Sequence, residues 1–296
     1  MNQINGPEMN LVHSVSLEEK ERALHARLDS LKSAIVAYSG GVDSAYLAYA
    51  AHAVLGQQML AVIADSASLA RSQLSDAGEF AREHGIPLRA IKTHELEREA
   101  YAVNGPDRCF HCKDELFSML EQELERTGFS ALAYGLNLDD RQDFRPGHKA
   151  AAQHRVTAPL AEAGLTKADV RALAQRAELR VWDKPASACL SSRVEYGRRV
   201  TPEALRMIEQ AEDSLRGLGL KRFRVRHHGT IARIEIAEEE MADVLQMGRM
   251  KAMAAVVRAA GFRYVSLDCE GYRSGSMNEV LPIEVLTGFQ NGGPPR

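Results

Sequence analysis

Cysteine is scarce in this chain: four of its 296 residues are Cys, and one is Trp. So few cysteines over this length do not make the disulfide framework of a small secreted protein. The first 16 residues also lack the basic start and the apolar core that are typical of a signal peptide. We therefore expect a cytoplasmic protein whose thiols are reduced.

Long apolar runs are also missing, and none approaches the ~18 residues of a membrane-spanning helix, so we expect no membrane segment. A net charge of −3 offers no surplus of positive charge for nonspecific binding of nucleic acid. The 45% of apolar and 26% of charged residues are an ordinary globular composition. The length is sufficient for two domains.

The most informative segment is 39–44, which reads Ser-Gly-Gly-Val-Asp-Ser. An apolar run at 34–38 predicts a strand before it, and small residues at 45–55 predict a helix after it. Two adjacent glycines allow a sharp turn and a close approach of a ligand, because neither carries a Cβ atom. The hydroxyls and the first N–H groups of the helix favour an anion. This pattern predicts a phosphate or pyrophosphate site.

The first half of the chain alternates strand and helix patterns, which predicts an α/β fold with a parallel sheet covered on both faces. Ligands of such sheets bind outside the carboxyl ends of the strands. Asp43, Asp65, Ser66 and residues 135–137 fall at such ends, so we expect them to meet in one crevice. Strands are expected at 34–38, 59–64, 88–91 and 131–135, and helices at 45–55 and 69–84.

The second half has a different pattern. A helix is expected at 166–179 with Thr166 as its N-cap, and the irregular segment 181–199 predicts a domain boundary. A small α+β domain with antiparallel pairing should follow, with helices at 202–216 and 250–260 and strands at 223–228, 231–236 and 263–267. We expect domains at 17–185 and 195–290.

Three of the four cysteines lie in suggestive places. Cys109 and Cys112 form a Cys-x-x-Cys pair, whereas Cys189 lies in the expected boundary segment between Lys184 and Arg193. Neighbouring positive charge raises the thiolate fraction of a thiol, although a lone Cys is more often a small buried residue. The pair itself fits a 4Fe–4S cluster completed by Cys189, a redox or persulfide dithiol, or a zinc site. A zinc ion would need a fourth ligand from His111, His148 or His154.

The motifs together resemble a known family. Segment 39–44 resembles the pyrophosphate loop (PP-loop) of the N-type ATP pyrophosphatases, Ser-Gly-Gly-x-Asp-Ser; no Gly-Lys-Ser/Thr follows, so it is not a Walker A loop. Asp-Arg-Cys-x-x-Cys-Lys at 107–113 and Lys-Pro-x-x-Ala-Cys-Leu-x-Ser-Arg at 184–193 follow in order. The combination resembles the LarE family over roughly residues 17–286.

The resemblance implies an adenine nucleotide α-hydrolase-like domain and an ATP-dependent sulfur transferase that helps to make the nickel-pincer cofactor. The implied substrate is pyridinium-3,5-biscarboxylic acid mononucleotide, whose carboxylate is adenylylated before sulfur replaces AMP. Relatives with a single active-site cysteine sacrifice it, at the position of Cys189. Relatives with three hold a 4Fe–4S cluster, which Cys109, Cys112 and Cys189 match. We favour the cluster, fed by sulfide or a cysteine desulfurase, in a homo-oligomer.

The resemblance also assigns site residues. Arg224 and Arg226 alternate along an expected strand and so share a face; with Arg193 they would bind the substrate phosphate, although a solvated basic strand is the alternative. Glu212, Glu235 and Asp243 would lie nearby. Asp43 would hold Mg²⁺. The residues expected to bind ATP are Ala37, Ser39, Gly40, Gly41, Asp43, Ser44, Ser66, Lys113 and Gly135.

Other functions share parts of this pattern. A tRNA thiolase also combines a PP-loop with cluster cysteines, but the net charge of −3 and the lack of a separate basic module do not favour RNA. Amidotransferase-type synthetases share the loop, but they use ammonia and would not need Cys189. A non-catalytic iron–sulfur or nucleotide sensor would bind ATP without releasing pyrophosphate.

Overall fold

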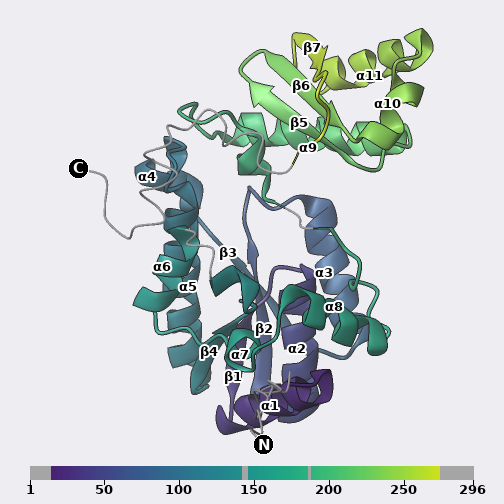
Figure 1. Ribbon diagram of the computed structural model, residues 1–296. Coiled ribbons are helices and arrows are strands. Elements are labelled where there is room, and N and C mark those ends of the chain that lie inside the picture. The colour runs from purple at the N-terminus through teal and green to yellow at the C-terminus, as the bar shows by residue number, and fades with distance from the viewer. Residues whose placement is uncertain (1–14, 142–145, 186–187, 274–296) are drawn as a thin grey trace, which may run out of the picture.

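The computed structural model describes residues 15–141, 146–185 and 188–273, and it has two lobes (Figure 1). The larger lobe is a sheet between two layers of helices, and the smaller lobe lies at one end of it. In the described parts of the chain, no helix is both long and apolar enough to cross a membrane.

The sheet of the large lobe has four parallel strands in the order β3-β2-β1-β4. This confirms the expected α/β class and all four strand positions. The strands end at one edge, so the segments that follow β1, β2 and β4 lie together. The bounds are β1 Ala34–Ala37, β2 Met59–Asp65, β3 Leu88–Lys92 and β4 Ala131–Tyr134.

Alternate residues of the strands face two separate cores. Val36 and Ile63 pack under one layer of helices, whereas Ile35 and Val62 pack under the other. Figure 1 shows the two layers on opposite sides of the sheet. The first layer contains α1 Leu17–Ser30, α2 Val42–Leu55, α3 Arg71–Glu83 and α8 Lys167–Arg176, and the second contains α5 Arg108–Thr127 and α6 Pro146–Gln153.

Several short elements connect the longer helices and strands. Thr166 caps α8 through the expected box with Asp169, because each side chain bonds the other residue's backbone N–H. The sequence analysis did not predict α1, α5, α6 or the single-turn helices. The short elements are η1 Gly56–Gln58, η2 Glu95–Glu97, α4 Glu99–Ala102, η3 Asp139–Arg141, α7 Pro159–Glu162 and η4 Leu190–Arg193.

The small lobe has a mixed sheet in the order β5-β6-β7. The hairpin between β5 and β6 is antiparallel, as expected, but β7 pairs parallel to β6, so antiparallel pairing throughout was wrong. Two helices separate β6 from β7, and this crossover returns the chain in the same direction. The bounds are α9 Pro202–Gly217, β5 Phe223–His228, β6 Ile231–Ile236, α10 Glu238–Val244, α11 Met247–Ala259 and β7 Tyr264–Leu267.

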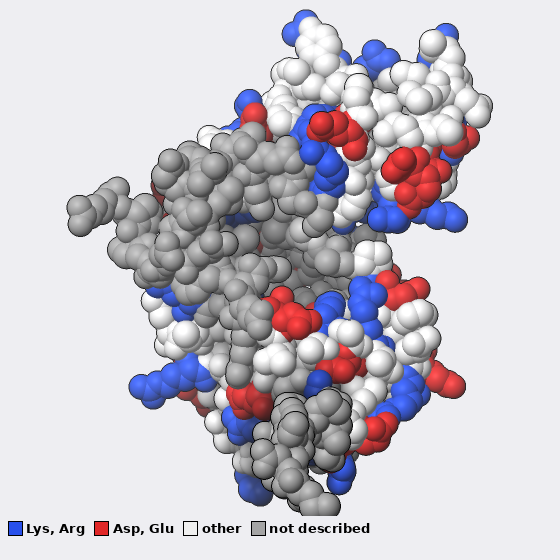
Figure 2. Space-filling model, viewed as in Figure 1, with Lys and Arg blue, Asp and Glu red and all other residues white. Residues whose placement is uncertain are grey.

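The surface carries both signs of charge. On the face shown in Figure 2, Lys and Arg are interspersed with Asp and Glu over the described residues of both lobes. Residues 274–290 of the second expected domain lie outside the described residues, and the domain boundaries stay a prediction.

Candidate active site

The glycine turn connects β1 to α2 as expected. Gly40 has φ +70°, and a Cβ there would lie 3.0 Å from the Cβ of Ala77, so only glycine fits without strain. The hydroxyls of Ser39 and Ser44 are 3.0 Å apart, and the Ser39 N–H donates to the Ser44 hydroxyl at 3.1 Å. Both hydroxyls therefore meet at the N-terminus of α2, where Gly41 is the N-cap. This geometry suits an anion such as pyrophosphate.

Asp43 lies in the first turn of α2 and has a cationic partner that the sequence analysis missed. Lys167, the first residue of α8, forms an ion pair with its carboxylate. Asn137, which is buried after β4, donates to the other carboxylate oxygen at 3.4 Å. The Asp43 carboxylate thus holds a positive charge beside the loop, and an oxygen ligand in this place can also hold Mg²⁺.

Gly135 lies where no side chain would fit. A Cβ on it would lie 2.7 Å from the backbone N of Ser44 and 2.9 Å from its Cα. These are backbone atoms of the first turn of α2, which cannot move aside as a flexible side chain can. Gly135 therefore lets the end of β4 pack directly against the N-terminus of α2.

Ala37 ends β1, and Ser66 directly follows the neighbouring strand β2 on the same edge of the sheet. The Ser66 hydroxyl is turned into the protein: it donates to the buried carboxylate of Glu95 and lies 2.7 Å from the Ser68 hydroxyl. Its carbonyl accepts from the guanidinium of Arg71 at 2.7 Å. The hydroxyl and the carbonyl of Ser66 are therefore both held by other residues of the protein.

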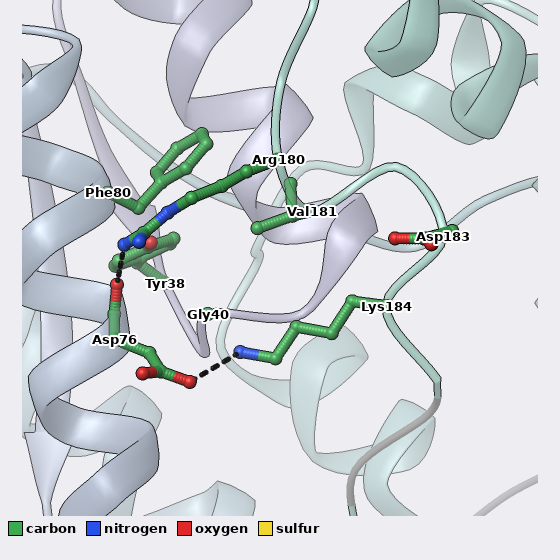
Figure 3. A pocket seen from close by; sticks show the side chains of 8 residues that line it. All are labelled: Tyr38, Gly40, Asp76, Phe80, Arg180, Val181, Asp183 and Lys184. Atoms are coloured by element: carbon green, nitrogen blue, oxygen red, sulfur yellow. Dashed lines mark hydrogen bonds and ion pairs between the residues drawn. The ribbon is translucent and has the colours of Figure 1, made fainter.

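A cleft of about 270 Å³ lies beside the loop (Figure 3). Gly40 and Tyr38 form its floor, and the side chain of Lys184 points into it from the segment that leads to Cys189. The Lys184 ammonium lies 3.7 Å from the carboxylate of Asp76. The positive charge of Lys184 is therefore directed toward the loop in this structure.

The Cys-x-x-Cys pair lies in the first turn and a half of α5. Cys109 is exposed, whereas Cys112 is half-buried and packs against the core of the small lobe. Lys113 lies with its ammonium 5.9 Å from the ring centroid of Tyr134, the last residue of β4. The start of α5 therefore adjoins the edge where the strands end.

Cys189 is the N-cap of η4 and is held at this edge by the residues of the large lobe that we call the socket: Ser68, Tyr101, Asn104 and Arg108. The N–H of Leu190 donates to the Ser68 carbonyl at 2.8 Å. The hydroxyls of Tyr101 and Ser191 are 2.6 Å apart, and Arg108 donates to the Ser191 carbonyl at 2.9 Å. The socket thus brings Cys189 from a segment about 80 residues away to the start of α5.

The three thiols lie within electrostatic range of one another. Burial raises the pKa of the Cys112 thiol well above its usual range, and the neighbouring Cys189, Glu95 and Cys109 raise it further. Burial alone would lower the pKa of Arg108, but charge on Cys189 and Cys109 outweighs this and raises it. Arg108 is therefore the buried cation that faces the thiols. Among the described residues, no three His, Cys, Asp or Glu side chains are grouped closely enough to hold a single metal ion.

Two of the three histidines considered as zinc ligands contact carboxylates instead. His111 lies 3.1 Å from Asp107, and His154 lies 3.2 Å from Asp114. The side chain of His148 lies outside the described residues. The fourth cysteine, Cys269, is exposed after β7.

The three expected phosphate-binding arginines lie together where the lobes join. Arg193 is 1% exposed; its Nε lies 3.1 Å from Glu212, and it donates to the Cys189 carbonyl at 2.8 Å. Arg226 pairs with the buried Glu235 at 2.6 Å.

Arg224 is half-buried and differs from the other two. Its guanidinium carbon lies 5.2 Å from the ring centroid of Tyr272. Burial lowers the pKa of Arg224, and the charges of Arg193 and Arg226 lower it further. Arg193 and Arg226 face buried carboxylates, so Arg224 is the guanidinium that gains most from an added anion.

Comparisons with known proteins identify the family. The NAD synthase family model matches residues 18–118. An uncharacterised protein of Synechocystis sp. is 40% identical over 90% of this chain and 99% of its own length. The pyridinium-3,5-bisthiocarboxylic acid mononucleotide synthase of Lactiplantibacillus plantarum is 36% identical over 93% of this chain and 99% of its own length. An uncharacterised protein of Methanocaldococcus jannaschii is 29% identical over 82% of this chain and 92% of its own length. The chain belongs to the LarE family of PP-loop ATP-dependent sulfur transferases.

Proposed function

We propose that this enzyme adenylylates a carboxylate of pyridinium-3,5-biscarboxylic acid mononucleotide and replaces the AMP by sulfur. The product is a thiocarboxylate for the nickel-pincer cofactor. The observation that carries the proposal is the docking of the segment that begins at Cys189. Its next residue, Leu190, donates its N–H to the Ser68 carbonyl after β2, and Arg108 at the start of α5 donates to the Ser191 carbonyl. In this position, the Cys189 sulfur lies at the same edge of the sheet as the loop at 39–44.

The first step makes the carboxylate reactive. A carboxylate oxygen of the substrate attacks the α-phosphorus of ATP, the bond to the bridging oxygen between the α and β phosphates breaks, and pyrophosphate leaves. Ser39, Ser44 and the N-terminus of α2 would bind the leaving pyrophosphate. Asp43 would hold Mg²⁺, with the ammonium of Lys167 released toward the phosphates. The ammonium of Lys113 would also stabilise the negative charge of the phosphates.

The second step transfers sulfur. A sulfur nucleophile attacks the acyl carbon, a carbon–sulfur bond forms, and AMP leaves with the electrons of the bond that breaks. Positioning of the sulfur next to the adenylylated carboxylate contributes most to the rate of this step, since both would be held at the same edge of the sheet. If Cys189 is the nucleophile, loss of its Cα proton and cleavage of its Cβ–S bond release the thiocarboxylate and leave dehydroalanine.

The three thiols fit a 4Fe–4S cluster by their chemistry. They are soft ligands, and iron bound beside Cys112 would stabilise the thiolate that burial disfavours. Cys109, Cys112 and Cys189 would hold it. When bound, the cluster supplies a sulfide from outside the chain, so that Cys189 keeps its sulfur.

The phosphate of the substrate needs a cationic site near the sulfur. Arg224, with Arg226 and Arg193 behind it, would supply a guanidinium fork where the lobes join. We also propose that sulfide or a cysteine desulfurase donates the sulfur, and that the enzyme is a homo-oligomer.

Anaerobic purification tests the proposal most directly. We expect about four irons per chain, an absorption band in the visible region and repeated turnovers with Mg·ATP and substrate. Cys109→Ala should lose the iron, whereas Cys269→Ala, an exposed and distant thiol, should keep it. Iron-free protein that loses about 34 Da at Cys189 per turnover would instead establish sacrifice of that residue. No release of pyrophosphate with this substrate would refute the function itself.

A further inference from the structure

The socket contacts nearly every turn of the segment that follows Cys189. Besides the bonds at Leu190 and Ser191, the Asn104 amide donates to the carbonyls of Val194 and Glu195 at 3.2 and 2.9 Å. Asn104 itself is fully buried with φ +60°, a conformation that such contacts must hold in place. The proposed chemistry uses none of these bonds directly.

Tyr101 occupies the centre of the socket. It is 1% exposed, and its ring belongs to the core of the small lobe. Burial raises the pKa of Tyr101, and the neighbouring thiols Cys189 and Cys112 raise it further, so the phenol keeps its proton. Its hydroxyl bonds Ser191 at 2.6 Å, two residues beyond Cys189.

A second polar cluster fixes the other side of Tyr101. Glu95 is 2% exposed and accepts from the hydroxyls of Ser66 and Ser68. Hydrogen bonds from Ser68 and Ser191 act on the phenol of Tyr101. A buried carboxylate is costly unless its bonds are made, so this cluster has one preferred arrangement.

The chain of bonds joins the two halves of the site. Ser66 directly follows β2 at the carboxyl edge of the sheet, beside the proposed nucleotide site. Tyr101 lies in the middle, and Ser191 lies two residues beyond Cys189. On the basis of the proposed function, we infer that Tyr101 is a positioning residue for the sulfur-transfer step. Its hydroxyl, through Ser191, holds Cys189 in a fixed place relative to the proposed nucleotide site. Adenylylation does not depend on this bond.

Tyr101→Phe tests this inference, since it removes one hydroxyl and keeps the ring in the core. With Mg·ATP and pyridinium-3,5-biscarboxylic acid mononucleotide, acid-quenched single turnovers give pyrophosphate and thiocarboxylate separately. We expect pyrophosphate formation to stay within about twofold of the wild type, and thiocarboxylate formation to fall about 10- to 100-fold. Adenylylated substrate should accumulate.

Tyr46→Phe is the matched control. Tyr46 is also buried, and its hydroxyl bonds Glu21 at 3.4 Å, beneath α1 and away from the socket. We expect both products at wild-type rates. A Tyr101→Phe enzyme that slows both products equally, slows pyrophosphate alone, or slows neither would overturn the inference.

Amide hydrogen exchange supplies a readout that needs no substrate. In Tyr101→Phe, the peptide 189–200 should exchange at least about tenfold faster, because the bonds of Ser191 and Leu190 open more often. Tyr46→Phe should leave this peptide unchanged. Unchanged exchange in Tyr101→Phe contradicts the positioning role even if the wild type makes no thiocarboxylate, which would refute only the proposed function.

Discussion

Gly135 and Gly40 both belong to the residues that the motifs assign to ATP, but their tasks are spatial. Gly40 allows the left-handed turn of the loop, and Gly135 allows the end of β4 to contact the backbone of Ser44. Neither task needs a polar group. At the scale of single residues, close approach between backbones determines the shape of the phosphate site.

Gly135→Ala should therefore lower the free energy of unfolding by about 1–3 kcal/mol, because the new Cβ overlaps backbone atoms that must shift. It should also weaken ATP binding, since the N-terminus of α2 moves. Urea denaturation and nucleotide titration measure the two effects.

Gly78→Ala is the control for this prediction. A Cβ there would have no heavy atom of the described residues within 4 Å, and α3 should gain up to about 1 kcal/mol from the better helix former. Equal stability of Gly135→Ala and the wild type would show that β4 can retreat from α2.

The elements were predictable to different degrees. Strands β1, β2 and β4 each contain a compact apolar run, whereas Arg89 interrupts the shorter run of β3; tertiary contacts did not change the assignment of any of the four. The signal for α5 was present in Phe117, Leu120 and Leu124, which follow a helical period, but the Cys-x-x-Cys pattern was interpreted only as a ligand pair. The parallel pairing of β7 depends on the crossover through α10 and α11, which no local pattern of β7 contains.

The same contrast holds for the site. The loop at 39–44 is local in sequence and could be predicted. Lys167 could not, because it meets Asp43 only after 124 residues of chain have folded around the sheet. The socket is equally remote, since Tyr101 and Ser191 are 90 residues apart.

Helices α5 and α6 are joined by a pH-dependent contact. His154, directly after α6, lies 3.0 Å from Glu121 and 3.2 Å from Asp114, both on α5. Partial burial alone would lower the pKa of His154, but these hydrogen bonds outweigh it and raise the pKa above its ordinary value. The folded pKa then exceeds the unfolded one, so the contact stabilises the fold fully below about pH 6.5 and is lost as the pH rises through the folded pKa.

His154→Gln should accordingly destabilise the protein more in acid than in base. We expect a loss of up to about 1 kcal/mol in the free energy of unfolding at pH near 5.5, because Glu121 is half-exposed, and a smaller loss at pH near 8. Denaturant titrations of both proteins at the two pH values measure the difference. A loss that does not change with pH would contradict the assignment of the charge to His154.

In the whole molecule, buried hydrogen bonds connect the two lobes. Asn104 lies at their junction, with two carbonyls of the connecting segment and the guanidinium of Arg108 as its partners. We therefore expect the lobes to unfold together. Trp182, the single tryptophan, reports on the large lobe by fluorescence, and circular dichroism reports on both.

Asn104→Ala should separate these transitions. It should cost at least about 2 kcal/mol, because buried carbonyls lose their donor and alanine is strained at positive φ. Fluorescence and circular dichroism should then give different midpoints. Glu178→Ala is the control, because Glu178 has φ +55° in an exposed position and its replacement should keep the two midpoints coincident.

The position of the socket also has a consequence for synthesis on the ribosome. The large lobe can form its sheet once β4 has emerged, but Ser68, Tyr101 and Arg108 must wait for residues 190–200. Until then, these polar groups of a nascent chain lack their partners, beside the proposed nucleotide site. Nucleotide binding to the growing polypeptide should therefore mature late, when the start of the second lobe closes the first.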